Sequence, residues 1–281
     1  MISDQVRSRL RWVKVSNADV DLALFPDFLI IGPQRTGTTW LHANLRHHPQ
    51  VFLAEPKELY FFSSLRWRPA KRFVSDELSW YLQFFRDPPW RRAAKIGRQL
   101  LRHGELYRPL VRGEATASYA ALEPDVIADI ALLNPDVKAI LMIRNPIDRA
   151  WSHAKKDLVR NAKRSIADVS EAEFRAFFTD PYQLRCADYV EQYDHWVAKL
   201  RPGQVHVIAF DDIGTRPEEV MLEVMRFLGV RADLRYLDRS LRSPVNPTEA
   251  DQIPPQFRAF LWELFKNDLA RLKERFGLEW R

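Results

Sequence analysis

The chain has little of what disulfide-stabilised or membrane-spanning proteins need. Cys186 is its only cysteine, so no disulfide can form within the chain, which suits a reducing compartment. No apolar run approaches the roughly 18–20 residues that cross a bilayer. The first fourteen residues do not read as a secretory signal. We therefore expect a cytoplasmic protein without a transmembrane segment.

The composition favours a globular protein with anionic ligands. Of the 281 residues, 46% are hydrophobic, enough for a substantial core in one domain. The net charge of +6 either serves solubility or attracts anionic ligands or surfaces. Nucleic acid is not an expected partner, because neither a zinc-finger spacing nor an aromatic RNA-binding motif is found.

Apolar runs alternate with helical patterns along the chain. Buried strands are expected at 27–31, 137–143 and 205–210. Helices are expected at 38–47, 181–200, 217–227 and 256–276. This alternation predicts a mostly parallel sheet with helices on both faces.

The segment after the first strand nearly matches a phosphate-binding loop. Residues 32–39 fit the pattern G-x-x-x-x-G-K-[ST], except that Thr38 replaces the lysine. Its backbone N–H groups can still face an anion at the start of a helix. The basic residue lies instead within the loop, at Arg35, which suits a donor with a single 5′-phosphate bearing a transferable group.

Three short motifs within residues 28–62 occur together in a known family. They are Arg35-Thr36-Gly37-Thr38-Thr39-Trp40-Leu41, then His48-Pro49, then Lys57-Glu58-Leu59-Tyr60-Phe61-Phe62. In this order they resemble the sulfotransferases that use 3′-phosphoadenosine 5′-phosphosulfate (PAPS), nearest the heparan-type and bacterial carbohydrate branch. The resemblance implies an α/β, P-loop-type three-layer fold, PAPS as donor, adenosine 3′,5′-bisphosphate (PAP) as product, and no metal.

The resemblance also assigns the donor contacts. A second block, residues 143–153, is similar to the family's segment for the 3′-phosphate, which implies that Arg144 and Ser152 bind that group. An arginine can hold two phosphate oxygens at once. The cofactor-binding residues implied in the first loop are Arg35, Thr36, Gly37, Thr38, Thr39 and Trp40.

Catalysis in this family is an in-line displacement at sulfur. The resemblance implies Glu58 as the general base, whereas the residue type alone indicates a surface carboxylate paired with Lys57. Arg35 is expected to stabilise the charge on the leaving phosphate. His42 and His153 are rival bases. No metal-ligand spacing is found among the histidines and carboxylates.

The acceptor side matches the family least. Residues 113–119 resemble a stretch that lines the acceptor cleft, and 242–247 occupy the place of a loop that closes over the donor. We expect a single sulfotransferase domain over 1–281, with variable helical acceptor-side segments at 65–112 and 155–200. The implied acceptor is a carbohydrate, glycolipid or small metabolite, and the oligomeric state stays open.

A helix is expected after Pro88-Pro89, with Arg91, Lys95, Arg98 and Arg102 on one face. Ala93, Ile96 and Leu100 lie opposite. The simpler interpretation is an ordinary amphipathic helix with a solvated basic face. The alternative is a lid for an anionic acceptor, or a peripheral contact with a membrane.

Two other classes of function stay open from the sequence. A P-loop nucleotide kinase would share the fold and the glycine loop, although the missing lysine at position 38 argues against it. A non-catalytic nucleotide-binding protein would keep the loop and lack turnover, and the presence of Glu58 argues against it only weakly.

Overall fold

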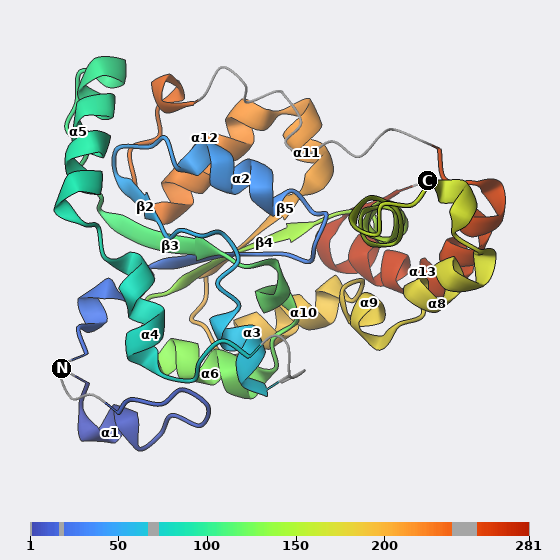
Figure 1. Ribbon diagram of the computed structural model, residues 1–281, viewed down its shortest axis with the longest axis horizontal. Coiled ribbons are helices and arrows are strands. Elements are labelled where there is room, and N and C mark those ends of the chain that lie inside the picture. Colours follow the sequence, from blue (N-terminus) through green and yellow to red (C-terminus); the bar gives the residue numbers. More distant parts are fainter. Residues whose placement is uncertain (1, 17–19, 67–72, 238–251, 281) are drawn as a thin grey trace.

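The computed structural model describes residues 2–16, 20–66, 73–237 and 252–280 (Figure 1). The predicted donor-closing loop at 242–247 lies outside these residues. Within them, five parallel strands form one sheet in the order β2-β3-β1-β4-β5. The strands are β1 (Phe28–Ile31), β2 (Val51–Leu53), β3 (Val111–Ala115), β4 (Lys138–Ile143) and β5 (Val205–Ala209).

The central strand β1 is buried on both faces, as its unbroken apolar sequence predicts. It pairs with β3 on one side and with β4 on the other. Ile30 lies opposite Ala115 of β3 and Ile140 of β4. The carboxyl ends of these three strands therefore meet at one edge of the sheet.

Helices cover both faces of the sheet (Figure 1). One face packs against α2 (Thr38–Leu45), α11 (Phe210–Thr215) and α12 (Pro217–Leu228). The other packs against α3 (Phe61–Arg66), α4 (Leu78–Leu82), α6 (Pro124–Leu133) and α10 (Tyr189–Val197). The predicted three-layer α/β fold is confirmed.

Further helices extend the domain beyond the sheet. They are α1 (Asp4–Arg7), α5 (Pro89–His103), α7 (Pro146–Ala154), α8 (Glu171–Phe178), α9 (Pro181–Arg185) and α13 (Pro255–Phe276). Helices α7, α8 and α13 share a third apolar cluster in which Trp151 stacks on Phe174 and Phe257. A π-helical segment, Lys155–Asn161, continues α7.

The structure corrects one predicted helix and adds two strands. The helix expected at 181–200 is divided into α9 and α10, because the Asp188 carboxylate accepts a hydrogen bond from the Glu191 N–H (2.9 Å) and starts a new helix. Strands β2 and β3 were not predicted. The first has three residues, and the second contains Arg112 and Glu114, which interrupt its apolar pattern.

Gly113 gives a test of the sheet's packing. A Cβ at this position would lie 2.4 Å from Cζ of Phe28, a fully buried ring on the neighbouring strand. We expect Gly113→Ala to lower the free energy of unfolding by about 1–3 kcal/mol through overpacking, measured by urea denaturation. Gly97→Ala is the control, because a Cβ there meets no atom within 4 Å in the interior of α5. It should stabilise slightly, and equal midpoints for both variants would contradict the packing argument.

Candidate functional site

The predicted phosphate-binding loop begins where β1 ends, and the second predicted block begins where β4 ends. From β1 the chain passes through α2 to β2, on one side of the sheet. From β4 it passes through α7 to β5, on the other side. Open α/β sheets bind ligands in the crevice between two such strands. The topology therefore brings two segments more than 100 residues apart to one site.

The backbone of the loop is shaped for an anion. Gly37 has φ of 97°, and a Cβ there would lie 2.7 Å from Cδ1 of Ile213, so no other residue fits without displacement. Arg35 also adopts the left-handed region, with φ of 77°. The Thr36 hydroxyl donates to the carbonyl of Pro33 (2.8 Å) and closes the turn. The first turn of α2 then presents its N–H groups at the loop.

Arg35, Ser152 and Arg144 join the two predicted blocks. Nε of Arg35 donates to Oγ of Ser152 (2.9 Å), and Nη1 of Arg144 donates to the Arg35 carbonyl (3.0 Å). The Arg144 guanidinium also lies over the Phe210 ring, 4.3 Å from its centroid. Each arginine is thus oriented by contacts within the protein.

The electrostatics of the site favour an anionic ligand. Burial lowers the pKa of Arg35, and the positive charges of Arg144 and Arg160 lower it further. Burial also lowers the pKa of Arg144. Both side chains stay charged at neutral pH, so two partly desolvated positive charges lie close together. A ligand with phosphate groups, such as PAPS, would relieve that repulsion, and the residues present fit it.

The remaining predicted donor residues lie in or beside this loop. Thr38 is buried and Thr39 is half-buried at the start of α2. Trp40 has a buried side chain that packs in the apolar cluster between α2 and the sheet, so a donor contact there would involve its backbone. The roles of Thr36, Thr38, Thr39 and Trp40 stay predictions.

Glu58 lies at the carboxyl end of β3, beside the loop that follows β1. Its N–H donates to the Ala115 carbonyl (3.0 Å), and its carboxylate accepts from the Ala117 N–H (3.0 Å) and pairs with Lys57. Its φ of 70° places it in the left-handed region that few residues other than glycine adopt. Such strain clusters at functional sites. Because β1 lies between β3 and β4, the phosphate-binding loop is flanked by Arg144 on the β4 side and by Glu58 on the β3 side.

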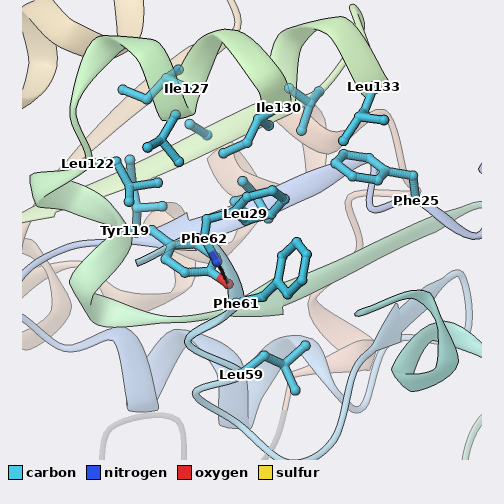
Figure 2. Packing of buried hydrophobic residues seen from close by; sticks show 14 of the residues in the cluster. Phe25, Leu29, Leu59, Phe61, Phe62, Tyr119, Leu122, Ile127, Ile130 and Leu133 are labelled. Carbon is cyan, nitrogen blue, oxygen red and sulfur yellow. Dashed lines mark hydrogen bonds between the residues drawn. The ribbon is translucent and has the colours of Figure 1, made fainter. Parts of the chain in front are cut away.

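The two phenylalanines that end the Glu58 motif anchor its segment in the core. Phe61 and Phe62 are fully buried in the cluster that also contains Tyr119 and side chains of α6 (Figure 2). The Phe62 N–H donates to the hydroxyl of Tyr119 (3.3 Å), the bond dashed in Figure 2. The aromatic pair of the motif thus holds Glu58 at the sheet edge.

Glu114 is a buried carboxyl group that the sequence interpretation missed. It accepts hydrogen bonds from the hydroxyls of Tyr81 and Thr116, the latter at 2.7 Å, and the Thr116 oxygen accepts from the Leu59 N–H (3.0 Å). Burial raises the pKa of Glu114 to about 7, against an ordinary value of 4.5. The sequence signal that could have indicated this buried carboxyl was a charged residue within the motif at 113–119. This network connects the core to the segment that carries Glu58.

The rival histidines are buried side chains. Burial lowers the pKa of His42 to about 4. Burial also lowers the pKa of His153, whose ring lies between Gln183 (3.0 Å) and Asp157 (3.3 Å). In the described ranges, no group of three or more His, Cys, Asp or Glu side chains is arranged to hold a metal ion. Helices long and apolar enough to cross a bilayer are absent from the same residues.

The fold and the site define a class of protein. A parallel sheet with a glycine-bounded loop before α2, and with two arginines at the switch point, is a P-loop-type domain that binds phosphorylated ligands. Residues 25–246 match the sulfotransferase domain family. The chain therefore belongs to this family, and the predicted membership is confirmed.

Curated relatives agree with this assignment, and solved structures share the fold. A bifunctional heparan sulfate N-deacetylase/N-sulfotransferase from Drosophila melanogaster is 28% identical over 246 residues, which cover 83% of this chain and 22% of the relative. A sulfotransferase from Alicyclobacillus acidocaldarius has a similar fold, with a TM-score of 0.66, 24% identity, and coverage of 91% of this chain and 97% of that one. Mouse sulfotransferase SULT7A1, solved in complex with PAP, has a TM-score of 0.51 at 15% identity, covering 99% and 92%.

Replacement of Glu114 should change how stability depends on pH. The folded protein holds this proton more tightly than the unfolded chain, so the neutral carboxyl stabilises fully below pH 4.5 and loses that effect as pH rises to about 7. The loss is on the order of 3 kcal/mol, at about 1.4 kcal/mol per unit. Glu114→Gln imitates the neutral form, so urea denaturation at pH 5 and pH 8 should show a smaller difference than in the wild type. Equal differences in both proteins would disprove the assignment.

Proposed function

We propose that this chain transfers a sulfonate group from PAPS to a hydroxyl or amine of an acceptor, with Glu58 as the general base. The observation that carries the proposal is the junction of two basic segments at the switch point, through the bonds between Arg35 and Ser152 and between Arg144 and Arg35. When bound, PAPS would supply the sulfonate and a bisphosphate leaving group. Arg35 and the N–H groups of α2 would hold the 5′-phosphate, and Arg144 and Ser152 the 3′-phosphate.

The residues around this junction have separable tasks. Glu58 would remove the proton of the attacking group as the bond to sulfur forms and the bond from sulfur to the 5′-phosphate oxygen breaks. Arg35 would stabilise the negative charge on that oxygen, and as an arginine it acts by charge and not as an acid. Lys57, paired with Glu58, would orient the carboxylate.

A cavity lined by Ser63 and Ser118, which are close in sequence to Glu58 and to its hydrogen-bond donor Ala117, suits a polar acceptor. It has a volume of about 220 Å³, and its polar lining residues include Ser63, Ser118 and Tyr182. Ser118 directly follows the residue that donates to Glu58, and it bonds to Ser63 (2.8 Å). The Tyr182 hydroxyl donates to Gln34 of the phosphate-binding loop (2.8 Å). The cavity lining is thus linked to the donor loop through Tyr182 and, through Ser118, to the segment that bonds to the proposed base.

The acceptor that we propose is a saccharide or another small hydroxylated molecule. The hydroxyl groups of the cavity can bond to sugar hydroxyls. Its charged lining residues, Arg66, Arg185 and Glu123, pair with one another, so the lining suits a polar acceptor of either charge or none. Its lining draws on both segments expected on the acceptor side, 65–112 and 155–200. The Drosophila relative is named for heparan sulfate, a carbohydrate, although this chain spans only 22% of its length. Mass spectrometry of products from a panel of sugars, glycolipids and small alcohols, with PAPS as donor, tests the proposal. Absence of any sulfonated product would favour the non-catalytic alternative.

Replacement of Glu58 tests the general base. Glu58→Gln removes the base with little change in volume, so we expect kcat to fall by at least about 100-fold while the affinity for PAP stays within about twofold. Turnover is measured by release of PAP, and affinity by calorimetry.

Glu55→Gln is the matched control, because Glu55 lies three residues upstream with an exposed side chain. It should keep full turnover. Unchanged turnover in Glu58→Gln would show that another group takes the proton.

Arg144 is tested by comparing two ligands. Arg144→Ala should weaken PAP by about 10- to 100-fold, the effect of losing a charge-assisted contact, and weaken adenosine 5′-phosphate much less. The Arg144 side chain also supports the Arg35 carbonyl. Any damage to the loop would weaken both ligands alike, so the ratio of the two affinities isolates the 3′-phosphate contact. Calorimetry that shows equal losses for both would refute this role.

A further inference from the structure

Helix α5 exposes large apolar side chains to solvent. Trp90 is 69% exposed and Leu101 is 92% exposed, while Leu100 is 47% exposed. Gln99 is the only residue of this helix that is fully buried. Two more exposed leucines, Leu106 and Leu110, follow in the segment that leads to β3. A surface helix of a soluble protein ordinarily turns its apolar face inward.

Contacts on the inner side of α5 set its orientation. The Gln99 side chain donates to the His47 carbonyl (2.7 Å), and Nζ of Lys95 bonds to Asp87 (3.1 Å) and lies over the Phe52 ring. These two residues therefore face the body of the protein. Lys95 therefore does not belong to the exposed basic face that was predicted for it from the sequence.

With the inner side set, the helical period places the apolar residues outward. At about 100° per residue, Trp90, Ala94, Gly97 and Leu101 share a stripe opposite Gln99. A Cβ built on Gly97 meets no atom within 4 Å, which confirms that this side is open. The predicted basic face is exposed at Arg91 and Arg98, and the structure adds an exposed apolar stripe beside it, which an ordinary amphipathic helix would turn inward.

Arginines border the stripe along one side. Arg91 and Arg98 lie on the flank of the stripe, and the Arg91 guanidinium is 5.1 Å from the Trp90 ring centroid. Arg102 lies nearer the inner side, where its Nη1 is 3.1 Å from Nδ1 of His47. The helix from Pro89 to His103 contains no acidic residue. A tryptophan, leucines and small residues beside arginines are the composition of helices that lie in a membrane interface.

We propose that α5 docks this protein on a membrane surface that contains anionic lipid, with the stripe of Trp90 and Leu101 among the acyl chains and the arginines at the headgroups. A two-fold contact between copies would oppose these arginines with one another, which disfavours a second copy as the occupant. Nucleic acid would pair with the arginines but leave Leu100 and Leu101 in water. Figure 1 shows α5 at the outer edge of the molecule beyond β2, at the opposite end of the sheet from β5.

Flotation with vesicles tests the proposal on the full chain. Wild-type protein should bind vesicles of phosphatidylcholine with 30% phosphatidylglycerol, bind pure phosphatidylcholine at least tenfold more weakly, and be released as salt is raised. The double variant Trp90→Ser, Leu101→Ser should lose at least tenfold in affinity for the anionic vesicles. Arg91→Gln, Arg98→Gln should lose a similar factor.

Matched controls distinguish vesicle binding through α5 from binding through exposed apolar or basic residues elsewhere on the surface. Trp262→Ser, Leu234→Ser replaces the same residue types at exposed positions elsewhere, and Lys199→Gln, Arg226→Gln removes the same charge. Both controls should bind as the wild type does. All variants should keep the wild-type melting temperature and affinity for PAP, which shows that they fold. The proposal is overturned if the wild type does not bind anionic vesicles at low salt. It is also overturned if controls and α5 variants bind equally, or if sedimentation shows a dimer that Leu101→Ser dissociates.

Discussion

The position of β1 between β3 and β4 is the constraint on which the rest of the structure depends. Four consecutive buried apolar residues, Phe28–Ile31, allow this strand to lie only in the middle of the sheet, covered on both faces. Its register places Ile30 beside both Ala115 and Ile140. The phosphate-binding loop, the Arg144 segment and the Glu58 segment therefore emerge at one edge, within reach of one ligand.

At that edge, the phosphate-binding loop and the Glu58 segment are both held in an unfavourable backbone conformation. Both Arg35 and Glu58 have left-handed backbone conformations, and each is held by neighbours that belong to another strand. Such conformations persist only where the surroundings over-determine them. Arg144 holds the phosphate-binding loop in its conformation. The network from Glu114 through Thr116 to Leu59 holds the Glu58 segment in its own. The orientation of the proposed catalytic groups is thus maintained from within the core.

Much of this could be predicted from the sequence, for reasons that lie in short-range patterns. The long apolar runs indicated β1, β4 and β5, and the spacing of Gly32 and Gly37 indicated the loop. Strands β2 and β3 could not be predicted, since three residues or a run broken by Arg112 and Glu114 have no clear period. The division of 181–200 depended on a single cap at Asp188, which competes locally with helix propensity.

By itself, the sequence determined the class of fold and the family, and it predicted which residues would bind two phosphates, because these depend on residue types at fixed local spacing. Only the tertiary structure decided that Arg35 bonds to Ser152, that Glu114 is a buried acid beneath Glu58, and that α5 turns its apolar stripe outward. Each of these depends on contacts between distant segments. A helical period shows which residues share a face, but only packing against His47 and Phe52 decides which face meets solvent.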